Sequence, residues 1–435
     1  MAETYSTLAA LFTDIADAIR EKTGETDSIV ADDFPDVIRD RLQVIPPPPP
    51  YLTFSSPSSF TLAVNDATKH WDGTLEYFTA DKTWTTWDGT TTLFSVISGS
   101  DNVLYLRGTG NTVISGNSPD YKWVLTGSNI ACAGNIENLL DYTTVESGNH
   151  PTMAPYCYFG MFFGCTGLTQ APTLSATTLA DMCYSGMFYD CTSLAQAPAL
   201  PATTLATNCY DNMFVNCTSL TQAPALPATT LANGCYNYMF DNCTSLTQAP
   251  ALPATTLVID CYYGMFHGCT SLTQAPALPA TTLAKGCYRS MFFGCTALTQ
   301  APALPATTLA SSCYQSMFSD CTSLTQAPTL SATTLADMCY SGMFYGCTGL
   351  TQAPALPATT LANNCYYIMF YGCTALKLSS TQTGEYTVAY RIPTAGTGST
   401  ATNALTDMFK STGGTFTGTP EINTTYYLSN TNTVV

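Results

Sequence analysis

The sequence predicts an α+β, mainly β fold in which a solenoid of nine 26-residue coils follows a small β sandwich and an N-terminal helical hairpin. Three observations predict this: apolar residues at helical spacing near the N-terminus, short alternating runs after a proline tract, and one pattern that returns every 26 residues from Cys157 onward. The expected segments are a helical hairpin at 1–45, a polyproline linker at 46–50, a β sandwich at 51–128, an N-terminal cap at 129–156, the solenoid at 157–382 and a C-terminal cap at 383–435.

The first 45 residues predict two amphipathic helices. One ends at Gly24, and the other begins near Asp32 with Pro35 in its first turn. The apolar stripes are Leu8, Leu11, Phe12, Ile15 and Ile19, and Phe34, Val37, Ile38, Leu42 and Ile45. Two short helices cannot bury both stripes alone, so we expect the hairpin to dock on a partner or on copies of itself, with a cap on the next domain as the alternative. Residues 46–50 are all proline and favour an extended spacer.

Residues 51–128 predict a small antiparallel sandwich. Alternating runs (FTLAV, TLEYFT, TTLFSVI, NVLYLRG and YKWVLTG) are separated by turn-forming pairs such as Asp-Gly and Asn-Ser. All four tryptophans lie in this segment: Trp71, Trp84, Trp87 and Trp123. They would either stack on sugars or fill the sandwich core, and the core is favoured because large aromatic side chains dominate such cores.

The repeat reads Cys-Tyr-x-x-Met-Phe-x-x-Cys-Thr-x-Leu-Thr-Gln-Ala-Pro-x-Leu-Pro-Ala-Thr-Thr-Leu-Ala-x-x, where x varies. A unit this short cannot bury its own Leu, Met and Phe side chains, so these must pack against their equivalents in neighbouring units. We expect parallel extended pieces about 4.8 Å apart at Leu-Thr-Gln and Thr-Thr-Leu, a helical turn at Cys-Tyr-x-x-Met-Phe, and prolines at the corners. Ala131–Tyr142 is placed to seal the first coil, and Ala404–Phe409 echoes the repeat as a degenerate last coil.

Each unit contributes two cysteines, and Cys132 completes the nineteen. Because the chain is large and has no recognisable export signal, buried reduced thiols are favoured over disulfides. Zinc is disfavoured, since spacings of eight and eighteen residues match no finger pattern and His267 is the one histidine in the repeats.

Variation among the aligned units is confined to three pairs of positions: before the first cysteine, after the tyrosine and after the phenylalanine. Stacked units would align these pairs into one strip. Rigid aromatic side chains and adaptable Asn or Asp suit recognition, but exposed positions also drift freely, and both explanations stay open. The candidate binding residues are Tyr189, Asn237, Tyr238, Tyr263, His267, Arg289, Phe293, Tyr345, Tyr367 and Tyr371.

Composition and missing motifs exclude several classes of function. The net charge of -17 leaves no cationic surface for phosphates, so no nucleic acid is expected as a partner. No apolar run reaches the roughly 20 residues of a membrane helix, and the N-terminus lacks the basic region of a signal peptide. Phosphate loops, zinc-protease motifs and serine-hydrolase motifs are absent, so we expect no enzyme, no catalytic residue, no cofactor and no metal.

The core Met-Phe-x-x-Cys-Thr-x-Leu-Thr and the tail Leu-Pro-Ala-Thr-Thr-Leu resemble the 26-residue BspA-like leucine-rich repeats of bacterial surface proteins, over about residues 153–412. The resemblance implies a leucine-rich-repeat-like solenoid used for adhesion. The chain departs from such adhesins because it shows no export signal and no wall anchor.

Residues 11–38, LFTDIADAIREKTGETDSIVADDFPDVI, resemble the N-terminal segment of bacteriophage tail fibre and minor tail proteins. This resemblance implies a receptor-binding protein of the virion tail, made in the host cytoplasm without a signal peptide. Its expected partners are phage tail or baseplate proteins, a host surface glycan or protein, and copies of itself, with a trimer as one arrangement. The alternatives are a bacterial surface adhesin and a structural spacer in a virion that binds nothing.

Overall fold

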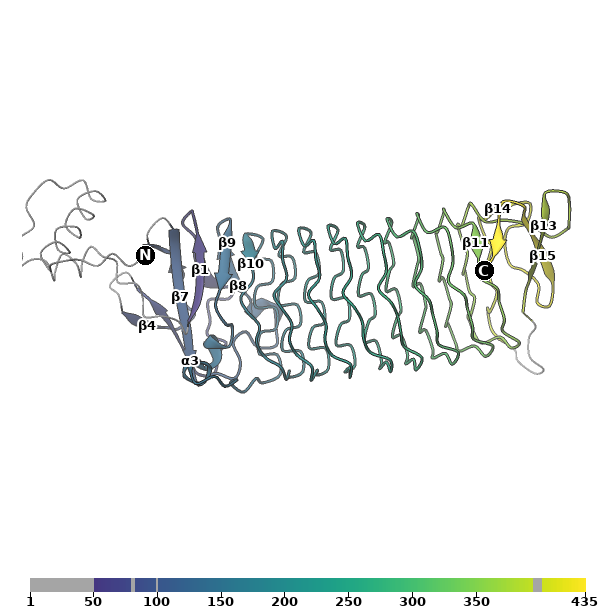
Figure 1. Cartoon of the computed structure of the whole chain (residues 1–435). Coiled ribbons are helices and arrows are strands. Elements are labelled where there is room, and N and C mark those ends of the chain that lie inside the picture. The colour runs from purple at the N-terminus through teal and green to yellow at the C-terminus, as the bar shows by residue number, and fades with distance from the viewer. Residues whose placement is uncertain (1–50, 80–82, 99–100, 394–400) are drawn as a thin grey trace, which may run out of the picture.

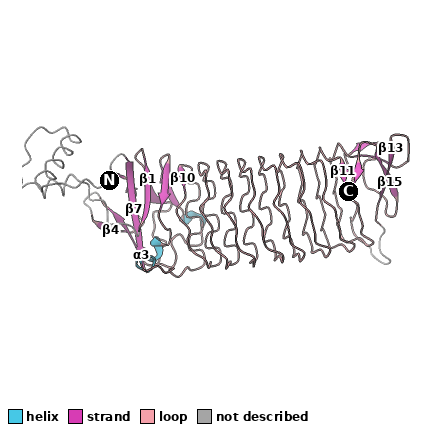
Figure 2. Ribbon diagram, viewed as in Figure 1, coloured by secondary structure: helices cyan, strands magenta, loops and turns pink. Residues whose placement is uncertain are grey.

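The computed structural model describes residues 51–79, 83–98, 101–393 and 401–435. The hairpin predicted at 1–45 and the linker at 46–50 lie outside the described residues. The described chain forms a row of short coils with strand-rich segments at both ends (Figure 1). Figure 2 shows that most of the row consists of loops and turns rather than long strands.

The five runs expected to form strands between residues 51 and 128 all do so, and two further runs, LTFSS and WTTW, form strands that were not expected. Together these strands fall into two sheets. Their bounds are β1 Leu52–Ser56, β2 Thr61–Val64, β3 Thr74–Phe78, β4 Trp84–Trp87, β5 Leu93–Phe94, β6 Val96–Ser98, β7 Asp101–Thr109 and β8 Trp123–Thr126, with a 3-10 helix η2 at Pro119–Tyr121. The smaller sheet has the order β5-β2-β8. The larger one runs β10-β9-β1-β7-β3-β4, with β6 on β7, so it continues past residue 128 into the first repeat through β9 (Ile130–Ala133) and β10 (Leu168–Gln170).

Three of the four tryptophans are core residues, as the sandwich pattern favoured. Trp87 packs between Trp71 and Trp123, with ring centroids 5.1 and 5.6 Å away, and all three are buried. Trp84 is partly exposed and lies under the Arg107 guanidinium, 4.1 Å from the ring centroid. The described tryptophans therefore serve packing, and the sugar-stacking alternative finds no support at Trp71, Trp87 or Trp123.

The first repeat is covered on its N-terminal side by strand β9 and by helix α3 (Asn138–Glu146). Strand β9 is antiparallel to β1 but parallel to β10, so it acts as the first rung of the repeat ladder. The Ile136 carbonyl accepts a hydrogen bond from the Tyr158 hydroxyl at 3.1 Å, which joins this segment to the first unit. Helix α3 has a kink at Asp141, whose backbone is extended.

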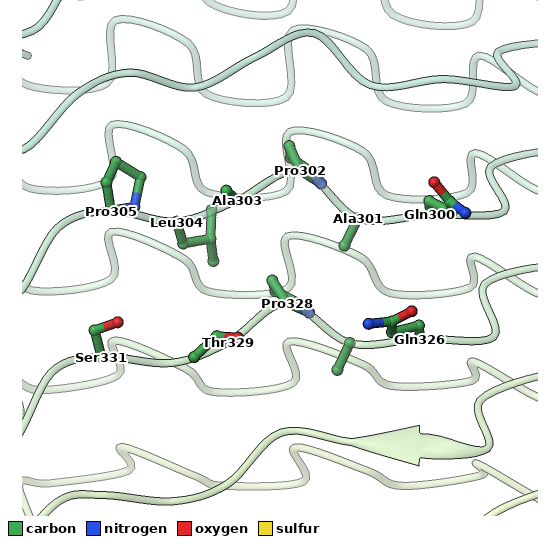
Figure 3. A pocket seen from close by; sticks show the side chains of 11 residues that line it. Gln300, Ala301, Pro302, Ala303, Leu304, Pro305, Gln326, Pro328, Thr329 and Ser331 are labelled. Carbon is green, nitrogen blue, oxygen red and sulfur yellow. The ribbon is translucent and has the colours of Figure 1, made fainter. Parts of the chain in front are cut away.

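Successive 26-residue units stack in parallel and in register, like over like. Isolated parallel bridges join Gln248 to Gln274 and Thr256 to Thr282, among others, so the extended pieces predicted at the Gln and Thr positions are confirmed. Figure 3 shows Gln300 beside Gln326 and Pro302 beside Pro328 on neighbouring coils. The buried Tyr and Phe rings also form columns, with neighbouring centroids 5.5–5.9 Å apart. The ring columns are thus spaced more widely than the roughly 4.8 Å of paired extended strands.

The predicted helical turn is wrong. We use the term turn segment for the residues from the one before the first cysteine to the second cysteine of a unit. In the unit at 182–191, Met182, Gly186 and Asp190 have φ of 56°, 61° and 58°, and the same three positions are left-handed in every unit. A right-handed helix cannot hold a left-handed residue at every fourth position.

Hydrogen bonds explain why this conformation replaces a helix. The Tyr184 N–H donates to the Cys209 carbonyl of the next unit at 3.0 Å, whereas the Met187 N–H donates to the Tyr184 carbonyl of its own unit at 3.2 Å. The alternation repeats along the turn segment, so every second amide ties one coil to the next. Buried amides must be paired, and here the partners come from a neighbouring unit.

The C-terminal residues form one more turn segment and then a small sheet. The Phe409 ring lies 5.5 Å from Phe370, and the Tyr366 N–H donates to Ala404, so the degenerate last coil predicted around 404–409 is confirmed. The remaining strands are β11 Gln352–Ala353, β12 Lys377–Ser379, β13 Tyr386–Arg391, β14 Gly413–Gly414, β15 Thr425–Ser429 and β16 Thr433–Val434, in a sheet β13-β15-β12-β14 and a parallel pair β11-β16. Within the described residues, no helix has both the length and the apolar character that crossing a bilayer demands.

Candidate binding surface

The second residue of each variable pair is left-handed, and this restricts its choice. Glycine, Asn, Asp and Ser occupy most of these positions, as expected where φ is positive. Where the residue has a side chain, that side chain often leans over a glycine of the next unit. A Cβ on Gly268 would lie 2.2 Å from Asn242 Oδ1, and one on Gly286 would lie 2.0 Å from Asp260 Oδ1. The residue type at the second position of each pair is therefore limited by the left-handed backbone and by the fit to the neighbouring coil.

The first residues after the conserved tyrosine and phenylalanine form two parallel columns, which we call the strip. Nine of the ten candidate residues belong to it, and the tenth, Tyr238, is a left-handed residue with φ of 47°. All ten are partly exposed. Gly, Asn and Asp recur at every fourth position of the turn segment. This spacing was the sequence signal that would have separated the strip residues from the left-handed residues.

The phenylalanine-side column of the strip is divided into three aromatic groups. Phe163 stacks on Tyr189 at 4.6 Å, His267 on Phe293 at 4.8 Å, and Tyr345 on Tyr371 at 5.0 Å. The groups are separated by short or buried side chains at Val215 and Ser319, which interrupt the column. The first and last groups end on ammonium groups: Lys122 lies 4.6 Å from the Phe163 centroid and Lys410 5.8 Å from that of Tyr371. Phe163, Lys122 and Lys410 were not among the predicted site residues.

The middle group is the most elaborate, and we call it the central cluster: Tyr238, Asp241, Tyr263, His267, Arg289 and Phe293. Tyr238 contacts Tyr263 and His267, at ring distances of 4.7 and 6.0 Å. The Arg289 guanidinium lies 5.0 Å from the Tyr263 ring centroid. The cluster brings together five of the ten predicted residues from three consecutive units.

Hydrogen bonds fix two of these side chains. His267 Nδ1 lies 2.7 Å from Asp241 Oδ1, with both side chains partly exposed. The pKa of Tyr238 is raised above that of a free tyrosine, mainly by burial and secondly by a hydrogen bond with the Tyr263 side chain. The side chain therefore stays a neutral phenol. Tyr367 and Asn237 lie in the tyrosine-side column, and no ring contact joins either of them to the central cluster within the described residues.

A largely buried carboxyl lies in the same column beside the cluster. Asp211 Oδ2 accepts hydrogen bonds from Asn212 Nδ2 at 2.8 Å and from the Ser185 hydroxyl at 3.4 Å, while Oδ1 has no partner. Burial raises the pKa of Asp211 to about 6 in spite of these donors. The strip therefore has a polar stretch at Ser185, Asp211 and Asn237 and an aromatic stretch at the central cluster.

The cysteines are free and buried, as predicted, and they are unsuited to chemistry. In each unit after the first, the second cysteine donates its thiol to a phenylalanine carbonyl of the preceding coil, for example Cys269 Sγ to Phe240 O at 3.1 Å. Burial raises the pKa of Cys209 and Cys287 to about 12. A thiol that is neutral and inaccessible neither attacks substrates nor binds metal.

Among the described residues, no group of three or more His, Cys, Asp and Glu side chains comes together to hold a metal ion. Away from the strip, a shallow groove of about 420 Å³ runs between the coils at 300–305 and 326–331, where Ser331 takes the position of Pro305 (Figure 3). Its lining of Gln, Ala, Pro and Thr carries no charge.

Comparison with known proteins identifies the repeats. A family model described as the BspA type leucine rich repeat region matches in six copies, over residues 143–273 and 233–377. No curated protein and no solved structure matches the chain.

Proposed function

Because the chain belongs to the BspA-type leucine-rich-repeat family, we propose that its repeats form a solenoid that binds a ligand on a cell surface along the strip. The central cluster is the observation that carries this proposal. Its Tyr and Arg side chains are of the types that contribute most to binding energies, and its aromatic rings offer rigid contact area at low entropic cost. The chain is a binding protein in this proposal, and it catalyses no reaction.

We further propose that the chain is a phage tail fibre or receptor-binding protein. The support is the resemblance of residues 11–38 to the N-terminal segment of phage tail proteins. The N-terminus would attach to tail or baseplate proteins and bring copies together as a homo-oligomer, with a trimer as one arrangement, and the strip would meet a host glycan or protein. The protein would then reside in the virion tail.

A bacterial cell-surface adhesin is the second candidate, and the repeat family supports it equally well. Immunogold labelling with an antibody against the repeats separates the two. Gold on the tails of purified virions supports the first proposal. Gold confined to the surface of intact bacteria, with unlabelled virions, refutes it in favour of the adhesin.

A spacer that binds nothing is the third candidate, and the composition of the central cluster argues against it. The test exchanges only the strip residues of two units, Tyr263 and His267 against Gln315 and Ser319, and leaves the left-handed second residue of each pair in place. The scaffold and the number of units stay the same, so adsorption to host cells should fall. Unaltered adsorption would identify the strip as inert.

A further inference from the structure

We infer that the central cluster binds an acidic saccharide, with a sugar ring on its aromatic side chains and a carboxylate or phosphate on Arg289 and Lys285. This inference rests on the proposed function, since it names the ligand class of the same strip. Three features of the cluster support it: aromatic residues that are partly exposed, two basic residues in one of its coils, and a ring held in position by the neighbouring coil.

The aromatic side chains offer a platform of sugar size. His267 and Phe293 stack at 4.8 Å from adjacent coils, and Tyr238 packs against Tyr263 at 4.7 Å beside them. A pyranose ring has one face of C–H groups, which packs on aromatic surface, and a rim of hydroxyls, which needs hydrogen-bonding groups. Asp241, which is hydrogen-bonded to His267, and the hydroxyl groups of Tyr238 and Tyr263 are the polar groups that the cluster offers to that rim.

The two basic residues of the repeats belong to one coil of the central cluster. Between Cys157 and Cys373 the sequence contains two basic residues, Lys285 and Arg289, and both belong to the coil that supplies Phe293. Among the described residues neither forms an ion pair, since Asp241 pairs with His267 instead. On a chain with a net charge of -17, two unpaired cations four residues apart give a local site for an anion.

The position of the Tyr238 ring depends on a glycine in the next coil. Tyr238 lies over Gly264 of the next coil, where a Cβ would come within 2.3 Å of its ring carbon Cε1. Gly264 therefore leaves the space that lets Tyr238 reach Tyr263 and His267. A ring fixed before binding loses little entropy when a ligand arrives.

The first experiment measures binding of the full chain to neutral oligosaccharides, to their sialylated or uronic-acid counterparts, to their phosphorylated counterparts and to polyglutamate. We expect binding to the acidic saccharides, and a loss of roughly 10- to 100-fold in Lys285→Gln/Arg289→Gln. Lys377→Gln, at an exposed lysine outside the strip, is the control for charge and should bind as the native chain does. The carboxylated and phosphorylated arms identify the source of the anion.

Equal binding of neutral and acidic saccharides, preference for polyglutamate, or full affinity in Lys285→Gln/Arg289→Gln would overturn the inference. The proposed function fails by a different result, namely adsorption to host cells that is unaltered when Tyr263 and His267 are exchanged with Gln315 and Ser319. A chain that needs its strip for adsorption but ignores acidic saccharides would keep the function and lose the ligand class.

The second experiment uses two glycines at the same position of the turn segment. Gly264→Ala should weaken saccharide binding severalfold, because the methyl group displaces the Tyr238 ring. Gly186→Ala is the matched control: its φ is 61° against 58° at Gly264, but its Cβ meets nothing closer than 4.0 Å. Equal affinity of the two variants would show that the Tyr238 ring plays no part, and would overturn its place in the site.

Discussion

At the scale of single residues, Asp211 is a carboxyl group whose ionised form is disfavoured by its surroundings. Its folded pKa, about 6, exceeds the ordinary value of 3.8 because burial penalises the charged form. An acid whose pKa is raised by folding favours the unfolded state once it ionises, so its cost to stability grows as the pH rises from about 4 to about 6 and is constant above that.

We therefore expect Asp211→Asn to stabilise the protein at pH 8, by on the order of 1–3 kcal/mol, and to give no gain at pH 4. Chemical denaturation of the native chain and the variant at the two pH values measures this. A gain that is the same at pH 4 and pH 8 would show that the ionisation of Asp211 is not its cause.

The thiols give a second prediction at this scale. Because burial holds the pKa of Cys165 and Cys339 at about 12, and because all nineteen thiols are buried, iodoacetamide should label none of them in the native protein at pH 8. In denaturant without reductant all nineteen should react, which mass spectrometry counts. Cysteines that stay unlabelled after unfolding would be disulfides and would contradict the free-thiol structure.

Residue types predicted exposure well and backbone conformation poorly. The variable positions of the repeat gave ten candidate residues that are all partly exposed, nine of them on the strip, since positions that vary between identical scaffolds have little to pack against. The left-handed conformation of Tyr238 and Ile368 was not predictable from their residue types, because bulky side chains disfavour it. Hydrogen bonds from the next coil impose it.

At the scale of elements, the turn segment shows how neighbours override local preference. A Cys-Tyr-x-x-Met-Phe run has the spacing of a helical turn, but the bonds that decide its conformation run between units 26 residues apart. The Gln and Thr bridges were predictable because alternation and β propensity act locally there. Strand β4 was missed because its conformation also depends on a partner outside the run, namely β3, with which Trp84–Trp87 forms backbone hydrogen bonds. The run WTTW itself is too short to predict a strand.

Two adjacent phenylalanines test the division of the turn segment into a core side and a binding side. Phe292 is fully buried, with stacked neighbours at 5.8 and 5.7 Å, whereas Phe293 is partly exposed on the strip. Phe292→Ala should destabilise the fold by about 3–5 kcal/mol, and Phe293→Ala by less than about 1 kcal/mol. Phe293→Ala should instead weaken ligand binding.

Thermal unfolding and the saccharide assay, run on both variants, measure the two effects. Comparable destabilisation by Phe292→Ala and Phe293→Ala would mean that the strip is part of the core. Unchanged binding in Phe293→Ala would remove this ring from the platform.

At the scale of the whole molecule, each coil contacts its neighbouring coils, and the end segments contact the first and last coils, so stability is close to a sum over units and interfaces. Removal of residues 313–338, one whole period, should leave a shorter stack that unfolds cooperatively at nearly the native temperature. Removal of residues 313–337, one residue fewer, shifts every later unit out of register and should lower the melting temperature by many degrees. Similar melting temperatures for the two deletions would contradict a stack in register.

The period of 26 and the degenerate last coil made the order of the chain predictable, because a repeat too short to form a core must pack on its copies. The sharing of one sheet between the first repeat and the segment before it was not predictable, since β9 pairs with β1 in one direction and with β10 in the other. Pairing of this kind depends on strands far apart in the sequence.

The most direct test of the account is a set of distances between spin labels along the strip side of the stack. Cysteines placed at Thr207 and at Ser311, Asp337 or Asn363 accept labels four, five or six units apart, while the native thiols stay buried. Double electron–electron resonance should give distances that lengthen by one coil spacing, 5.5–5.9 Å, for each added unit. Distances that fail to rise in equal steps with unit number would contradict the in-register stack, and with it the continuous strip on which the proposed binding depends.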